Sequence, residues 1–189
     1  MNQAFELRAT TELNTLKEIS EAISSSLDLT TVMKKILDVL HRHLGMERGT
    51  IALLNPDTNE ISIEAACGLD VEEIKRGRYK IGEGVMGKVV ASGEAIVVPN
   101  VGKDALFLNR TGARDLSKAN IAFICVPIKL ENAAIGALSV DRLFQEETSF
   151  DEDARLLIII SSMVAQAVRI QELVKWEKES LTSENQRLK

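Results

Sequence analysis

The chain has 189 residues, of which 45% are apolar and 27% are charged, with a formal net charge of −5. This composition fits one globular domain with an appendage, and the acidic balance argues against a surface that grips nucleic acid. The apolar runs, such as Leu156 to Ile160, are too short to span a bilayer, and the first residues do not resemble a signal peptide. We therefore expect a cytoplasmic protein that contacts neither nucleic acid nor membrane directly.

Two helices are predicted before any strand. Residues 4–27 carry apolar side chains at helical spacing, namely Leu13, Leu16, Ile19 and Ile23. Asp28 is then placed to cap a second helix, with an apolar stripe from Val32 to Leu44, and Gly45 is placed to end it.

After Gly45 the pattern changes to short strands. Residues 50–55 and 60–68 form a predicted hairpin, and residues 121–130 and 133–143 form a second one. Between the hairpins we predict a strand at 78–81, a short helix at 84–93 and a strand at 95–100, followed by a polar stretch at 101–120 with two weak helical turns. A capping box of Ser149 and Glu152 begins a last helix that runs to Lys189. Hairpins favour a mostly antiparallel sheet with helices packed on it.

Three glycines, Gly82, Gly84 and Gly87, have the G-x-G-x-x-G spacing of a dinucleotide-binding turn, and with Val89 they also fit a kinase loop. The context excludes both. The segment before the glycines is charged rather than a buried strand, the helix after them is short, and the other kinase motifs are missing from the sequence. We expect the glycines to serve the backbone, as a tight turn and a close approach of the short helix to the sheet.

Three motifs in order resemble the GAF domain family: residues 80–101, 122–142 and 149–168, within a resemblance that covers about residues 10–172. The resemblance implies an α+β fold with a mostly antiparallel six-stranded sheet. The N- and C-terminal helices would pack on one face, and the short helix and a loop would cover the other.

The whole chain further resembles the N-terminal regulatory region of NifA-type activators, which act on sigma-54 RNA polymerase and control nitrogen fixation. The resemblance implies a sensor domain that controls a downstream AAA+ module, and no enzyme. The phosphate-binding motif G-x-x-x-x-G-K-[ST] does not occur in this sequence. We divide the chain into an N-terminal helix for a dimer bundle (1–27), the GAF domain (28–172) and a C-terminal signalling helix or coiled-coil linker (173–189).

By the same resemblance, a small effector would lie between the sheet and the segment that follows the short helix. The implied ligand-binding residues are Tyr79, Val85, Met86, Val98, Arg114, Phe123, Cys125 and Ser139, with Ile81, Val89 and Ala137 as further wall residues. The alternative is that these side chains only fill the core. Basic residues of the following loop could clamp a carboxylate (Lys103, Arg110, Arg114 and Lys118), and some NifA-type proteins respond to 2-oxoglutarate, which is our candidate effector. A solvated loop of mixed charge is the alternative.

Two other site types are weaker. Where cyclic-nucleotide-binding relatives carry an N-K…F…D-E pattern, this chain has Asp141, Arg142, Phe150 and Asp153, which favours an ion pair between strand and helix instead. Cys125 with Asp141 resembles nitric-oxide sensors that hold non-haem iron, although a buried structural thiol is the simpler interpretation. We predict no metal site and no catalytic residue.

The terminal helices are expected to form a homodimer. Its interface would use Leu16, Ile19, Ile23, Val164, Val168 and Ile170, and a seven-residue repeat (Ile160, Ala167, Val174, Leu181 and Leu188) would continue as a coiled coil. Three functions remain open: an effector sensor, an iron or redox sensor, and a ligandless domain for dimerisation or docking of a regulatory partner protein.

Overall fold

The computed structural model describes residues 2–116, 120–143 and 150–187. Ser149 and Lys118, to which the sequence analysis gives roles, lie outside these ranges. The elements, in chain order, are α1 (Asn2–Ser25), α2 (Leu29–Leu44), β1 (Gly49–Asn55), β2 (Glu60–Cys67), α3 (Val71–Arg76), β3 (Arg78–Lys80), α4 (Gly84–Ser92), β4 (Ile96–Val98), β5 (Ile121–Leu130), β6 (Ala133–Leu143) and α5 (Asp151–Arg187).

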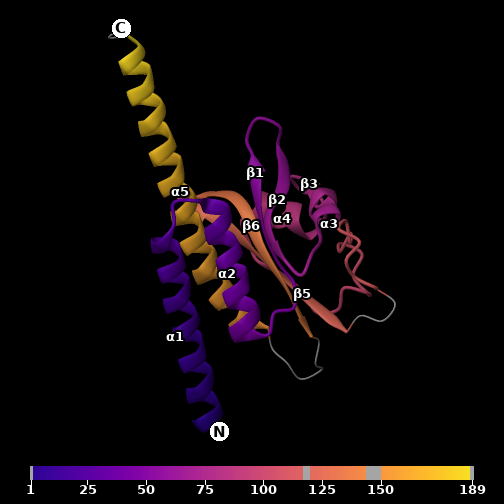
Figure 1. The fold of residues 1–189 in the computed structure, drawn as a ribbon. Coiled ribbons are helices and arrows are strands. Elements are labelled where there is room, and N and C mark those ends of the chain that lie inside the picture. Colours follow the sequence, from indigo (N-terminus) through magenta and orange to yellow (C-terminus); the bar gives the residue numbers. More distant parts are fainter. Residues whose placement is uncertain (1, 117–119, 144–149, 188–189) are drawn as a thin grey trace.

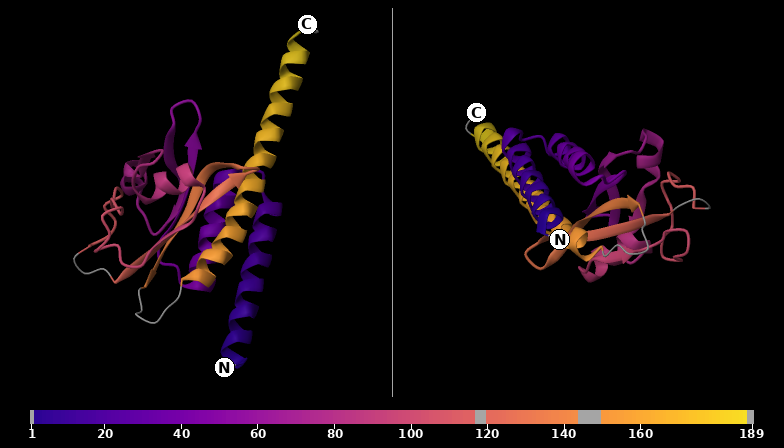
Figure 2. Two further views of the ribbon diagram at one scale, coloured as in Figure 1. Left: turned by 180° about the vertical axis from the view of Figure 1, so that it is seen from behind. Right: turned by 90° about the horizontal axis from the view of Figure 1, so that it is seen from below.

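The six strands form one sheet in the order β3-β2-β1-β6-β5-β4, and every neighbouring pair is antiparallel. Helix α5 lies against β5, and α2 lies against β1 and β2, on the same face of the sheet (Figure 1). Helix α4 and the segment that follows β4 cover the opposite face. The predicted α+β architecture is therefore confirmed. Helix α1 differs in one respect, because it packs mainly on α2 and α5 and forms an outer layer (Figure 2).

The alternation of side chains along β5 and β6 creates two separate cores. Ile124 and Val126 of β5 and Leu138 of β6 face the helices and join the larger core under α2 and α5. The residues that alternate with them along each strand, such as Phe123 and Ala137, face α4 and join a smaller core. Each strand residue on the α4 face is thus next in sequence to a residue on the face that α2 and α5 cover.

The ends of α2 follow the prediction. The Asp28 carboxylate accepts a hydrogen bond from the backbone N–H of Thr31, and Gly45 adopts the left-handed conformation that ends the helix, with φ of 61°.

Two predictions for the middle of the chain are wrong. Residues 71–76 form helix α3, where only a charged segment before the glycines was predicted, although Asp70 and Glu73 make a complete capping box. The described part of the segment between β4 and β5 contains turns rather than the two helical turns expected of it. We call residues 101–116 of this segment the lid.

The glycine motif serves the backbone, as expected. Gly84 has φ of +59°, which side chains rarely tolerate. A Cβ atom on Gly87 would lie 2.2 Å from the carbonyl oxygen of Lys80, so only glycine lets α4 approach the end of β3 this closely. The Gly82 N–H donates to the Gly87 carbonyl at 2.8 Å, which closes the turn.

Helix α5 is long and continuous, with 37 residues. Within the described residues it is long and apolar enough to cross a membrane by length and composition alone, over Asp151–Thr182. Leu157, Ile160 and Val164 on this helix are nevertheless completely buried against the sheet, as in the core helix of a globular domain.

Candidate ligand pocket

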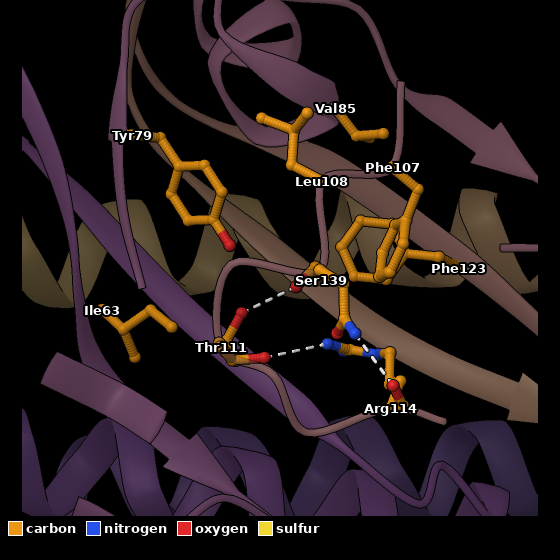
Figure 3. Close-up of a pocket in the computed structure, with 11 residues that line it drawn as sticks. Ile63, Tyr79, Val85, Phe107, Leu108, Thr111, Arg114, Phe123 and Ser139 are labelled. Atoms are coloured by element: carbon orange, nitrogen blue, oxygen red, sulfur yellow. Dashed lines mark hydrogen bonds between the residues drawn. The ribbon is translucent and has the colours of Figure 1, made fainter. Parts of the chain in front are cut away.

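A small cavity lies between the sheet and the lid, at the edge of the smaller core (Figure 3). The side chains around it come from β1, β2, β3, α4, the lid, β5 and β6: Thr50, Ile63, Tyr79, Val85, Phe107, Leu108, Asn109, Thr111, Arg114, Phe123 and Ser139. About 20 Å³ is open to the centre of a water molecule, which is room for about one water. With the lid in this position, the cavity is too small to hold an organic effector.

Five of the eight ligand-binding residues implied by the sequence do line this cavity: Tyr79, Val85, Arg114, Phe123 and Ser139. The other three, Met86, Val98 and Cys125, lie in the smaller core beneath it, together with Val89 and Ala137. Ile81 is partly exposed outside the cavity.

The lid also contributes wall residues that were not predicted from the sequence, namely Phe107, Leu108, Asn109 and Thr111. The apolar run from Ala105 to Leu108, inside an otherwise polar loop, was the available signal.

Arg114 is buried and already holds a carboxylate, that of Asp141 on β6. Its Nε donates to Oδ2 at 2.8 Å and its Nη2 donates to Oδ1 at 2.7 Å, a bidentate pair. The guanidinium also lies over the rings of Phe107 and Phe123, at 5.1 and 5.4 Å from their centroids (Figure 3). Arg114 therefore fastens the lid to the sheet. It is neither a free clamp for an effector's carboxylate nor part of a solvated loop, the two alternatives that the sequence left open.

Three further contacts hold the lid down. Arg76 donates two hydrogen bonds to the carbonyl of Thr111, at 3.0 and 2.6 Å. Arg110, one of the predicted clamp residues, pairs with Glu83 at the start of α4. Phe107 packs edge-on against Phe123, with ring centroids 5.0 Å apart.

The cavity retains polar groups with spare hydrogen-bonding capacity. Asn109 Oδ1 is buried and has no partner in the described part of the chain. The side chain of Tyr79 points into the cavity (Figure 3), and burial raises the pKa of its hydroxyl, against the opposing effect of nearby Arg114. The hydroxyls of Ser139 and Thr50 instead satisfy each other at 2.7 Å. A molecule that entered would find the unpaired Asn109 oxygen of the described chain as an acceptor, and the Tyr79 hydroxyl as a further polar group.

The residue after Asp141 makes the matching contact on the helix face. Arg142 Nε donates to Asp153 of α5 at 2.8 Å, and Arg8 of α1 donates to the other oxygen of the same carboxylate at 3.0 Å. The ion pair expected between strand and helix is thus present, and it also includes α1. Asp141 and Arg142 connect the lid on one face with two terminal helices on the other.

The candidate iron ligands do not form a metal site. Asp141 is occupied by Arg114, and Cys125 Sγ lies 3.9 Å from the sulfur of Met86. Burial raises the pKa of the Cys125 thiol well above its ordinary value, which keeps it protonated. Across residues 2–116, 120–143 and 150–187, no group of three or more His, Cys, Asp or Glu side chains could hold a metal ion.

The predicted dimer residues divide into two groups. Ile19, Val164 and Val168 are buried in the chain's own larger core, so a second copy cannot reach them. Leu16 and Ile23 are half-buried against that core, and Ile170 is exposed.

Comparison with known proteins agrees with this geometry. The sequence profile of the GAF domain matches residues 28–168. The chain belongs to the GAF family. Among solved structures, the nlh2 GAF domain of A. aeolicus superposes with a TM-score of 0.77 at 25% identity, covering 86% of this chain and 98% of that one. A free methionine-R-sulfoxide reductase from Neisseria meningitidis, with a TM-score of 0.72 at 18% identity over 88% of this chain and 93% of that one, shares the fold.

The GAF domain described here is also similar to nitrogen-fixation regulators. It is 36% identical to the nitrogen fixation protein VnfA of Azotobacter vinelandii over 92% of this chain. It is 37% identical to a Nif-specific regulatory protein of Herbaspirillum seropedicae over 94% of this chain. The chain spans about a third of the length of these relatives, 34% and 33% respectively.

Proposed function

We propose that this chain is the sensor domain of a NifA-type, sigma-54-dependent transcriptional activator. The observation that carries the proposal is the identity of 36–37% with nitrogen-fixation regulators along more than nine-tenths of the chain. The domain would sit in the cytoplasm and control an AAA+ module of the longer protein, and it would make no direct contact with nucleic acid or membrane. It would regulate rather than catalyse, because no cysteine, histidine or carboxylate lines the cavity in the described residues.

An effector would act by entering beneath the lid. Because the closed cavity has room for about one water, binding requires the lid to open and close again over the ligand. Arg114 is then available to an acidic effector only when it leaves Asp141. Our candidate is 2-oxoglutarate, whose carboxylates match the bidentate geometry of a guanidinium.

A thermal-unfolding screen of organic acids and nucleotides tests this proposal. A ligand that binds only the folded state should add about 2.7 kcal/mol at a hundred times its dissociation constant. We expect 2-oxoglutarate to raise Tm in a saturable way, and we expect Arg114→Lys to weaken the response, because lysine lacks the bidentate fork. Arg78→Gln is the control, since this exposed arginine pairs with Glu60 outside both the lid and the cavity.

The outcomes separate three cases. A response to 2-oxoglutarate that Arg114→Lys leaves unchanged would move the binding site away from this cavity. A flat response to 2-oxoglutarate beside a clear shift with another compound would change the effector and keep the sensor. No shift across the panel, and no co-purified small molecule in native mass spectrometry, would favour a second function.

That second function is a ligandless domain for dimerisation or for docking a regulatory partner protein. The small size of the closed cavity supports it. In either case the signal would leave through α1 and α5, which carry exposed apolar residues such as Leu13, Ile159 and Leu173. We infer that a second copy covers part of this surface, around a groove of about 410 Å³ lined by Arg8, Ala9, Glu12, Leu13, Leu16, Glu152, Arg155, Leu156 and Ile159.

A further inference from the structure

The lid cannot open without leaving Asp141 in need of another partner. The carboxylate is only 2% exposed, and its bidentate partner Arg114 belongs to the lid. A buried carboxylate that loses its hydrogen-bonded cation is strongly destabilised, because the interior does not solvate it as water does. Opening would therefore be very rare unless another cation took over.

Arg48, on the loop before β1, is placed to do so. Its Nη1 lies 3.7 Å from Oδ2 of Asp141, the oxygen that also accepts from Arg114 Nε. This distance is too long for a hydrogen bond, although short enough for attraction between the charges. The two residues are tied together by their backbones, since the Asp141 N–H donates to the Arg48 carbonyl at 2.8 Å.

Arg48 also has an unused donor. Its Nε is buried and has no hydrogen-bond acceptor within the described ranges of the chain. A buried donor without an acceptor is unfavourable in the closed state. A short movement toward Asp141 would bring the guanidinium within bonding distance of an acceptor.

We propose that Asp141 exchanges partners, from Arg114 when the lid is closed to Arg48 when it is open. Arg48 is then the positioning residue that makes the open state accessible. The inference deepens the proposed sensor function by stating how the lid is released. It concerns the protein without a ligand, so it can fail while the sensor function stands.

Hydrogen exchange of a lid amide, measured by NMR without ligand, tests the proposal. The Val101 amide of the lid donates to the Ile121 carbonyl of β5 at 3.0 Å, so its exchange reports separation of the lid from the sheet. In Arg48→Met the open state loses the second partner of Asp141, so we expect exchange at this amide to slow by about tenfold or more. A role of Arg48 in static support alone would give the opposite sign, and unchanged or faster exchange overturns the proposal. Arg78→Met, which removes an exposed arginine paired with Glu60, should leave exchange unchanged.

A double-mutant cycle gives an independent measurement. Arg48→Met alone should change the unfolding equilibrium constant by less than about fivefold, because Arg114 still holds Asp141. In the Arg114→Met background the same substitution should change it by about a hundredfold, because Asp141 is left with neither cation. Asp141→Asn should abolish this difference, and additive effects of the two arginine substitutions would contradict the exchange. If Arg114→Met does not fold, the exchange measurement decides alone.

Discussion

At the scale of single residues, the state of Cys125 bears on whether this domain senses redox chemistry. Its thiol is fully buried in the smaller core, and burial raises its pKa. Cys67 is partly exposed, and burial raises the pKa of its thiol as well. Because the thiolate is the reactive form, both should be poor nucleophiles near neutral pH.

We therefore expect Cys67 to react slowly with a thiol reagent at pH 7, at a rate that still rises with pH above 9. Cys125 should react only after unfolding. Mass spectrometry of alkylated protein, with and without urea, assigns the modified residue, and Cys67→Ser is the control that removes the slow reaction. Rapid modification of Cys125 in the folded protein would revive the redox alternative.

Several residues of the site could be predicted because strands alternate. Once β3, β5 and β6 are recognised, Tyr79, Phe123 and Ser139 must share the face opposite the long helices. The same rule cannot separate cavity walls from core, and Val98 and Cys125, which the resemblance implied as ligand-binding residues, lie in the smaller core instead of lining the cavity. The pair of Arg114 and Asp141 was not predicted, because its partners are 27 residues apart and only the path of the lid brings them together.

At the scale of elements, the outer surface of α1 and α5 is where we expect a second copy to pack. Leu13 on α1 is 67% exposed and Ile159 on α5 is 51% exposed, and both line the same groove. Charged residues at the rim, including Arg8 and Glu152, are of both signs, so a two-fold related copy could pair with them. We expect the apolar side chains to be covered by a second copy.

Leu13→Asp combined with Ile159→Asp should convert the dimer into a folded monomer, because each places a charge at the contact. Light scattering gives the mass, and circular dichroism shows that the fold is retained. Val71→Asp, at an exposed site on α3, is the control and should leave the dimer intact. A monomer at high micromolar concentration in the unmodified protein would refute the proposed dimer. Ile19, Val164 and Val168 are unsuitable for this test because a charge there would disrupt the core.

Most elements could be predicted from hydrophobic spacing and caps, and the failures have local causes. Helix α3 has six residues and no buried side chain, so it lacks the apolar stripe on which helix prediction relies. The position of α1 outside α2 and α5 was not predictable either, because an apolar stripe shows that a helix packs, although not against which surface.

At the scale of the whole molecule, Asp153 ties three distant segments together. It is almost completely buried and accepts from Arg142 of β6 and Arg8 of α1. Asp153→Ala should reduce the free energy of unfolding by about 1–3 kcal/mol, less than for a fully buried pair because both arginines are partly exposed.

Glu152→Ala is the matched control, because the adjacent carboxylate also pairs with Arg8 but is half-exposed. It should cost less than about 0.5 kcal/mol. Urea unfolding of both variants measures the difference. Equal effects would mean that the connection among β6, α1 and α5 adds no stability of its own.

The continuous course of α5 has a geometric consequence for any module attached to its far end. Its 37 residues make a rod of about 55 Å, which projects well past the sheet (Figure 1). Each residue added to such a rod turns everything beyond it by about 100°, so an insertion of one residue would point an attached module in a different direction. An insertion of seven would restore its direction to within about 20° and move it outward by about 10 Å. The helix therefore fixes an angular phase as well as a distance, and a sensor of this kind could communicate by rotation with no change in length.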